Sequence, residues 1–255
     1  MNVIRASQLT VDDAWLVEWS RFAAGLRFED IPAEVVAHAR LVLLDTLGAI
    51  AAGAQEPEMV ALSGRMAALH GAGGVTTAVI GGRTRLPLPV AAFLNGTAGT
   101  MLELDEGNQY CRGHPAIHVV PAALAESDRL GASGRDLIRA LVLGYEIGAR
   151  IGIASTLRVT MHPHGTWGTV GAAVAAGALA GSDAATMRET INVASTLGLA
   201  TSRRTMLQGG TVRNTYAGVS NQLGLTAVEL VGAGFVGEPD GVATVFGTVS
   251  ADDFR

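Results

Sequence analysis

Four of the six histidines in this 255-residue chain lie in two short segments. The first segment holds His114 and His118, and the second holds His162 and His164. Each segment directly precedes a predicted helix start, where free backbone N–H groups and the positive end of the helix dipole attract anions. An imidazole also transfers protons near neutral pH. The two segments therefore predict a site that binds an anionic substrate and moves a proton.

Residue types alone leave three other interpretations of these segments open. Imidazoles near Asp105 and Glu103 could ligate zinc or iron, and Cys111 could serve as a thiol nucleophile. Each histidine could also be an ordinary capping or loop residue. Because the second pair of histidines flanks a proline, and neither a helical His-x-x-x-His motif nor paired cysteines accompany them, we expect proton transfer and no metal.

An arginine-bearing segment without a clear helical period spans residues 201–218. It contains Arg203, Arg204 and Arg213, followed by Tyr216. A guanidinium grips a carboxylate through two parallel hydrogen bonds, so this segment could hold a carboxylate substrate. A solvated basic loop is the alternative, and it fits Arg213 least because a glycine-rich turn lies beside it.

Composition excludes several kinds of chemistry. All 18 basic residues are arginine, so a Schiff-base or pyridoxal lysine is absent from the sequence. The single cysteine, Cys111, supplies neither an iron–sulfur cluster nor a disulfide framework, which favours a reducing, cytoplasmic location. The sequence also lacks a nucleophile elbow, a phosphate-binding loop and a dinucleotide-binding fingerprint.

Charge and hydropathy limit the kinds of partner that the chain is expected to have. A net charge of −5 with dispersed arginines argues against nucleic-acid binding. With 49% apolar and only 16% charged residues, the chain can bury a large core and still present apolar surface, so we expect an oligomer. The N-terminal segment lacks a signal-peptide core, and the apolar stretches are interrupted, so we expect no membrane span.

Apolar periodicity and capping residues predict an all-α, multi-helix bundle. Helices are expected at residues 10–24, 32–53, 57–69, 89–103, 121–130, 133–153, 166–180, 183–199 and 218–233. The helix at 32–53 is apolar all round and is expected to be surrounded by others, and the Gly/Ala-rich helix at 166–180 is expected to be an inner helix. The one expected extended piece is at 75–80.

Six motifs in a fixed order resemble the MmgE/PrpD family over about residues 15–254. They are Leu43-Leu44-Asp45-Thr46-Leu47-Gly48, Asn95-Gly96-Thr97-Ala98, Leu104-Asp105-Glu106, Gly113-His114-Pro115, His162-Pro163-His164-Gly165-Thr166-Trp167-Gly168 and Gly210-Thr211-Val212-Arg213-Asn214-Thr215-Tyr216-Ala217-Gly218. The resemblance implies cofactor-independent lyase or isomerase chemistry on a small di- or tricarboxylate: dehydration as in 2-methylcitrate dehydratase, decarboxylation or epimerisation.

The family resemblance also implies a domain organisation. Residues 1–255 are expected to form a single helical domain like the family's N-terminal domain, which dimerises. The family's smaller C-terminal α+β lid domain is expected to be absent from this chain and supplied by a separate chain. The alternative is a non-catalytic helical dimerisation or carboxylate-binding module derived from such an enzyme.

Carried over position by position, the resemblance assigns roles to individual residues. The expected catalytic residues are Asp105, His114 and His162, and the expected substrate-binding residues are Arg213, Tyr216 and His164. Arg213 stands where the family has a lysine, so it keeps the positive charge but cannot donate or accept a proton in the reaction. The expected chemistry is proton abstraction or donation next to a substrate carboxylate.

Overall fold

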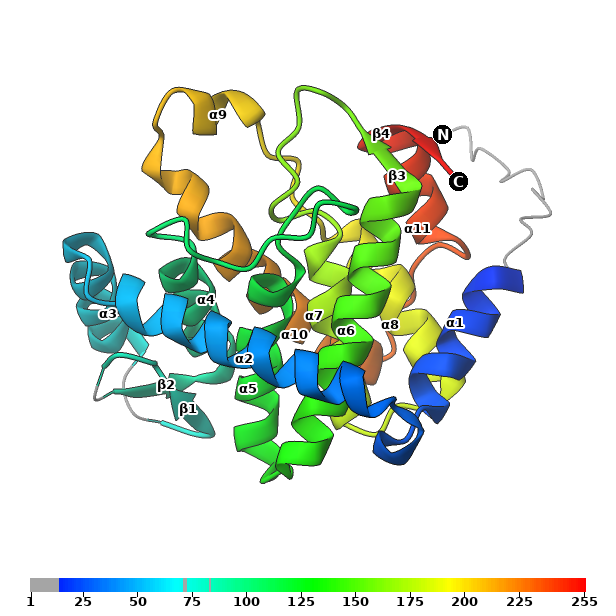
Figure 1. The fold of residues 1–255 in the computed structure, drawn as a ribbon, viewed down its shortest axis with the longest axis horizontal. Helices are drawn as coiled ribbons and strands as arrows, with labels where there is room; N and C mark the ends of the chain where they lie inside the picture. Colours follow the sequence, from blue (N-terminus) through cyan, green and yellow to red (C-terminus); the bar gives the residue numbers. More distant parts are fainter. Residues whose placement is uncertain (1–13, 71–72, 83) are drawn as a thin grey trace, which may run out of the picture.

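The computed structural model describes residues 14–70, 73–82 and 84–255, and most of them are helical (Figure 1). The α-helices are α1 (Ala14–Gly25), α2 (Ala33–Gly53), α3 (Pro57–His70), α4 (Leu88–Gly99), α5 (Pro115–Leu130), α6 (Gly134–Ala154), α7 (Gly168–Leu179), α8 (Ala184–Thr196), α9 (Arg203–Leu207), α10 (Tyr216–Gly232) and α11 (Gly241–Thr244). Shorter helical turns are η1 (Phe28–Asp30), η2 (Thr211–Thr215) and η3 (Val245–Val249). The predicted all-α, multi-helix architecture is confirmed.

Two small antiparallel pairs make up the strands of the described residues. β1 (Thr76–Ala78) pairs with β2 (Arg85–Pro87), and β3 (Ser155–Leu157) pairs with β4 (Ala251–Phe254). The expected extended piece at 75–80 contains β1, whereas the other three strands and the helical turns after residue 240 were not predicted. The strands are three or four residues long and the two helical turns four or five, too short for an apolar period to be visible in the sequence.

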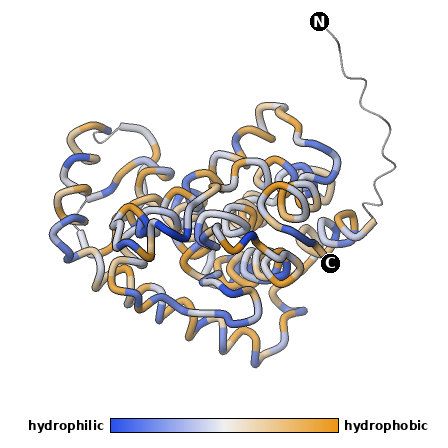
Figure 2. The backbone as a smooth tube through the Cα atoms, turned by 90° about the horizontal axis from the view of Figure 1, so that it is seen from above, coloured by the Kyte–Doolittle hydropathy of each residue, from blue (hydrophilic) through white to orange (hydrophobic). Residues whose placement is uncertain are grey.

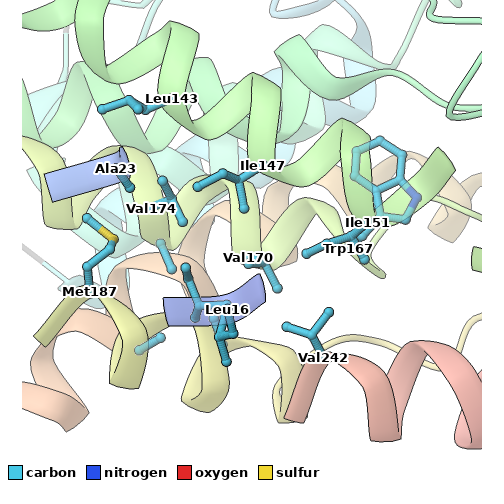
Figure 3. Close-up of a cluster of buried hydrophobic side chains, with 14 of the residues drawn as sticks. Leu16, Ala23, Leu143, Ile147, Ile151, Trp167, Val170, Val174, Met187 and Val242 are labelled. Carbon is cyan, nitrogen blue, oxygen red and sulfur yellow. The ribbon is translucent and has the colours of Figure 1, made fainter. Parts of the chain in front are cut away.

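The inner helix of the domain is α7, as its glycine and alanine content predicts. It is almost entirely buried and contacts α5, α6, α8 and α10. Small residues are required where it meets α6, because a Cβ on Gly144 would lie 2.5 Å from the backbone oxygen of Gly171. In Figure 3 the side chains of Val170 and Val174 on α7 lie between those of α6 and α1. Close backbone approach therefore organises the centre of the bundle.

Helix α2 differs from its prediction, because it is not surrounded. One face, including Val36 and Val42, is buried, but Leu41 and Leu44 on the opposite face are 64% and 68% exposed. The helix crosses the outside of the bundle over α4, α5 and α6 (Figure 1). Figure 2 shows hydrophobic segments reaching the outer edge of the molecule. Within the described residues, α2 is thus apolar on all sides but packs against other helices on only one of them.

By length and composition, α2 is also the one helix in the described residues that could cross a membrane. This is a weak indication, because long apolar helices that pack inside protein domains pass the same test. Here α2 contacts α4, α5 and α6, so it is an integral part of the bundle. The expectation that the chain has no membrane span stays a prediction.

The start of α5 corrects a second prediction. The helix begins at Pro115, and Pro121, expected as its first residue, lies inside it. Pro121 lacks the N–H that would bond to the oxygen of Ile117, and the break is repaired by Asn221 of α10. The Asn221 side chain donates to the Ile117 oxygen at 2.8 Å and accepts from the Ala122 N–H at 2.9 Å. A residue a hundred positions away therefore allows the helix to continue.

Helix caps agree with the sequence where the structure describes them. Ser133 and Asp136 form the expected capping box of α6, and Asp183 caps α8. The expected signal at residues 10–13 lies outside the described residues. Other limits shift by a few residues: α4 ends at Gly99 and α8 at Thr196, because a loop and not a further helical turn follows each of them.

Candidate functional site

The loop between α4 and α5 positions the first histidine segment. Glu106 anchors this loop: its carboxylate accepts the N–H of Ala116 at 3.1 Å and the hydroxyl of Tyr145 at 2.6 Å. Burial raises the pKa of Glu106. The start of α5 therefore holds a carboxylate of the chain itself. The expectation that a substrate carboxylate binds there stays a prediction.

Asp105 and His114 form the first functional pair. Nδ1 of His114 lies 3.2 Å from Oδ2 of Asp105, whose side chain is buried, whereas the imidazole is about one-third exposed. Burial raises the pKa of Asp105, while the charges of His114 and Arg213 oppose that shift. Because Nδ1 faces the aspartate, Nε2 of His114 is the nitrogen free for proton transfer. Asp105 and His114, both expected among the catalytic residues, are therefore in contact.

A glycine, Gly113, allows this loop to approach the ring of Trp167 closely. Gly113 lies against the ring of Trp167, and a Cβ at residue 113 would lie 2.6 Å from a ring carbon. The bridge between Asn108 and Gly113 closes the loop just before His114. The two histidine segments are thus packed together through a tryptophan that begins the next helix.

The second histidine segment lies between β3 and α7 and is fixed by its backbone. The hydroxyl of Thr201 donates to the carbonyl oxygens of both His162 and His164, each at 3.1 Å. The N–H of His164 donates to Nδ1 of His162 at 3.1 Å. This bond makes Nδ1 an acceptor, so neutral His162 carries its proton on Nε2. Burial, followed by the charges of Arg213 and His114, lowers the pKa of His162 to about 4.

All four clustered histidines meet around His164. Its ring centre lies 4.7 Å from that of His114, 5.1 Å from His118 and 4.8 Å from His162. Burial lowers the pKa of His118 to about 3 and that of His164 well below its usual range. These two imidazoles are therefore neutral at neutral pH, and within the part of the chain that the structure describes neither ring nitrogen of either has a hydrogen-bond partner.

Arg213 and Tyr216 complete the set of predicted residues. Arg213 lies on η2, is buried, and directs its guanidinium fork onto the carboxylate of Glu103 through two bonds. The ring centre of Tyr216 lies 5.9 Å from that of His162. The structure therefore brings together all six predicted residues, but it also shows that the arginine fork is already engaged.

Sequence reasoning missed the partners of these groups. Glu103 was considered only as a possible metal ligand, and neither the Glu106–Tyr145 bond nor the central contact of His118 was expected. Glu106 lies nine residues before the start of α5, and its contact with Tyr145 joins a loop to α6, so local spacing does not reveal either partner.

The other chemistries can now be compared with the geometry. Cys111 is buried, and burial raises the pKa of its thiol to about 11, so it is not a thiolate nucleophile at neutral pH. Asp105, His114 and His164 each present one possible ligand atom, all within 4.8 Å of one another. The cluster thus contains groups that can transfer protons, and three of its residues form a possible metal-ligand set.

Curated proteins with a named activity are similar in sequence to this chain. The chain is 28% identical over 229 residues to a cis-aconitate decarboxylase of Aspergillus terreus, covering 86% of this chain and 46% of the relative. It is 28% identical over 182 residues to a human cis-aconitate decarboxylase, covering 67% and 37% respectively. The chain therefore spans about half or less of the curated relatives it matches.

Family membership rests on a broader match. The model of the MmgE/PrpD N-terminal domain matches residues 17–251, which include every residue of the histidine cluster and Arg213. The region matched also covers the helical bundle from α1 to the start of β4. The chain belongs to the MmgE/PrpD family and contains its N-terminal domain.

Proposed function

We propose that this chain carries the acid–base half of a lyase or isomerase that acts on a small di- or tricarboxylate. The observation that carries the proposal is the Asp105–His114 pair, which lies beside neutral His162 and a buried arginine. Two imidazoles in different electrostatic environments suit the two proton transfers of such a reaction. Membership in a family whose matched relatives are lyases supports the same class of chemistry.

The two histidines have different roles in this proposal. Nε2 of His114 accepts a proton from the carbon next to a substrate carboxylate, and Asp105 stabilises the imidazolium that forms. His162, with its proton on Nε2, donates to the group that departs or to the carbon that receives a proton. In dehydration or epimerisation, the electron pair of the broken C–H bond is delocalised into the carboxylate; in dehydration it then forms the double bond as the hydroxyl leaves as water with the His162 proton. In decarboxylation the broken C–C bond supplies the electron pair, CO₂ leaves and an imidazole protonates the carbon. Exchange with solvent then removes the extra proton from His114 and returns one to His162.

The cationic anchor in this proposal is Arg213. Its fork already holds the carboxylate of Glu103, which shows that the guanidinium has the orientation and access that a carboxylate needs. Glu103 is largely exposed and can turn away into solvent, whereas Arg213 is buried. A substrate carboxylate would therefore take the place of Glu103. His164 and Tyr216 would line the same space beside His162.

The chain is proposed to work as a homodimer completed by a second domain. The outer face of α2 carries a stripe of apolar or small residues at helical spacing, Ala37, Leu41, Leu44, Gly48 and Ala51, and all of them are exposed. Such a stripe is typical of a helix–helix interface. Light scattering at several protein concentrations tests the dimer, and Leu41→Glu should shift the mass to that of a monomer.

The experiment that tests the function is turnover on a panel of carboxylates. Decarboxylation of cis-aconitate, dehydration of 2-methylcitrate and epimerisation of an amino dicarboxylate should each be followed, with and without the C-terminal domain of a family member added as a separate chain. Turnover of one substrate, lost in His114→Gln, supports the proposal. Binding of carboxylates with no turnover under either condition would favour a non-catalytic binding module instead.

A further inference from the structure

The most unusual feature of the cluster is His164. His164 is 1% exposed and is surrounded by three other imidazoles. Neither of its ring nitrogens has a hydrogen-bond partner among the described residues. Buried imidazole nitrogens are normally satisfied by a donor, an acceptor or a metal ion. The acid–base proposal gives His164 only a place in the lining, and it does not explain this arrangement.

Asp105, which belongs to the same cluster as His164, also has buried polar atoms without hydrogen bonds in the described residues. Both of its carboxylate oxygens are buried and lack a hydrogen bond, although one lies 3.2 Å from Nδ1 of His114. Two imidazoles and a carboxylate with open positions are the ligand set of many zinc and iron sites. One atom from each of Asp105, His114 and His164 lies within 4.8 Å of the other two.

The distances allow one ion with a modest contraction. Ligands placed about 2.0–2.2 Å from a zinc ion lie roughly 3.4 Å apart in a tetrahedron. The Asp105–His114 pair, at 3.2 Å, already has that spacing. The widest pair must draw together by up to roughly 1.4 Å. Of the three ligands, His114 has the most freedom to move, because its ring is partly exposed whereas the Asp105 side chain is buried.

We propose that Asp105, His114 and His164 form a binding site for one divalent transition-metal ion of the zinc class, with a fourth position left open. A bound ion would engage the same Asp105 and His114 that the proposed proton transfer uses. Zinc would therefore inhibit turnover.

The test is a titration of chelator-treated, substrate-free protein with cobalt(II), followed by absorption, and with zinc, followed by calorimetry. We expect one ion per chain. His164→Ala and His114→Gln should each weaken binding by more than about 100-fold, beyond the loss usual for a residue that only hydrogen-bonds to a metal ligand. The double variant His38→Ala/His70→Ala removes the two exposed histidines outside the cluster and should bind as the wild type does.

Controls make each outcome decisive. Circular dichroism shows whether His164→Ala is folded. If it is not, His114→Gln replaces it in the test, because His114 is partly exposed and its substitution disturbs the core less. Zinc should also raise the thermal unfolding midpoint of the wild type. Absence of binding by the folded wild type overturns the proposal, as does unchanged binding by folded His114→Gln or loss of binding in the surface double variant. Because no substrate is present, this result is independent of the proposed reaction.

Discussion

The guanidinium of Arg213 is paired through two bonds with the carboxylate of Glu103. The side chain of Arg213 is 7% exposed and that of Glu103 is 60% exposed, so a buried cation meets an anion that faces solvent. Glu103 also has a positive φ of 55°, a backbone conformation that non-glycine residues seldom adopt. An internal carboxylate thus occupies the arginine that the family resemblance assigns to the substrate.

Glu103→Gln is expected to tighten substrate binding. The neutral amide competes less well for Arg213, so the Kd for a di- or tricarboxylate should fall by about 3- to 10-fold, equivalent to roughly 1 kcal/mol. Calorimetry with citrate or cis-aconitate measures it. The matched control is Glu29→Gln, which alters an exposed glutamate paired with Arg135 and should change nothing. Weaker binding by Glu103→Gln would show that Glu103 holds the arginine in position for substrate.

His114→Gln and His162→Gln should each lower kcat by about 10²- to 10⁴-fold, the usual contribution of one acid–base group. Both variants keep a polar side chain of similar size, so the fold should be retained, as circular dichroism can verify. The control His70→Gln changes an exposed histidine and should leave kcat unaltered. A His162→Gln variant with full turnover in the completed enzyme would remove His162 from the mechanism.

Asn221→Leu should destabilise the protein by about 2–4 kcal/mol. It leaves the Ile117 oxygen and the Ala122 N–H buried without partners, at about 1–3 kcal/mol for each. Pro121→Ala restores the missing helical N–H, so the double variant should lose less stability than the single asparagine variant. Urea unfolding measures the three free energies. Strict additivity of the two changes would contradict the repair of the proline break by Asn221.

Gly144→Ala should destabilise the bundle by about 2 kcal/mol or more, because its new Cβ would overlap a backbone oxygen of α7, which cannot move without separating two helices. Gly64→Ala in α3 is the matched control. It has no atom within 4 Å of the added carbon, so it should stabilise the helix by up to about 1 kcal/mol. Equal effects of the two substitutions in thermal unfolding would argue against close α6–α7 packing.

Stability should fall as the pH drops below about 6.5. In the unfolded chain His118, His162 and His164 become protonated there, whereas their pKa values in the folded protein are far lower. Each of these three histidines lowers the free energy of unfolding by up to about 1.4 kcal/mol per pH unit. Their full contribution to stability is present only above pH 6.5. Asp105 and Glu106 have raised pKa values in the folded protein, so as the pH falls they bind protons in the folded state before they do in the unfolded state. At lower pH they therefore offset part of the loss of stability.

Denaturant unfolding between pH 7.5 and 5 measures this dependence. His118→Phe removes one of the three buried groups and should reduce the slope by about a third if the ring is accommodated. His70→Phe is the control, since residue 70 is exposed. A flat profile for the wild type from pH 7.5 to 5 would show that the imidazoles are not held neutral by burial.

Much of the helical framework could be predicted from local sequence. The capping box at Ser133 and Asp136 and the Gly/Ala pattern of α7 each act through neighbours within one or two turns, so they are visible in the chain itself. Pro121 shows the limit of such reasoning. Its position is consistent with a helix start, and only a partner on α10 lets the helix run through it.

The sequence by itself determined which residues could do chemistry: an aspartate, four clustered histidines and an arginine in family motifs. Only the tertiary structure decided how they meet. It places His164 among three imidazoles, pairs Arg213 with Glu103, and leaves one apolar face of α2 exposed. The physical reason is that pKa values, ion pairs and exposure depend on burial and on neighbours from distant segments, which no local spacing specifies.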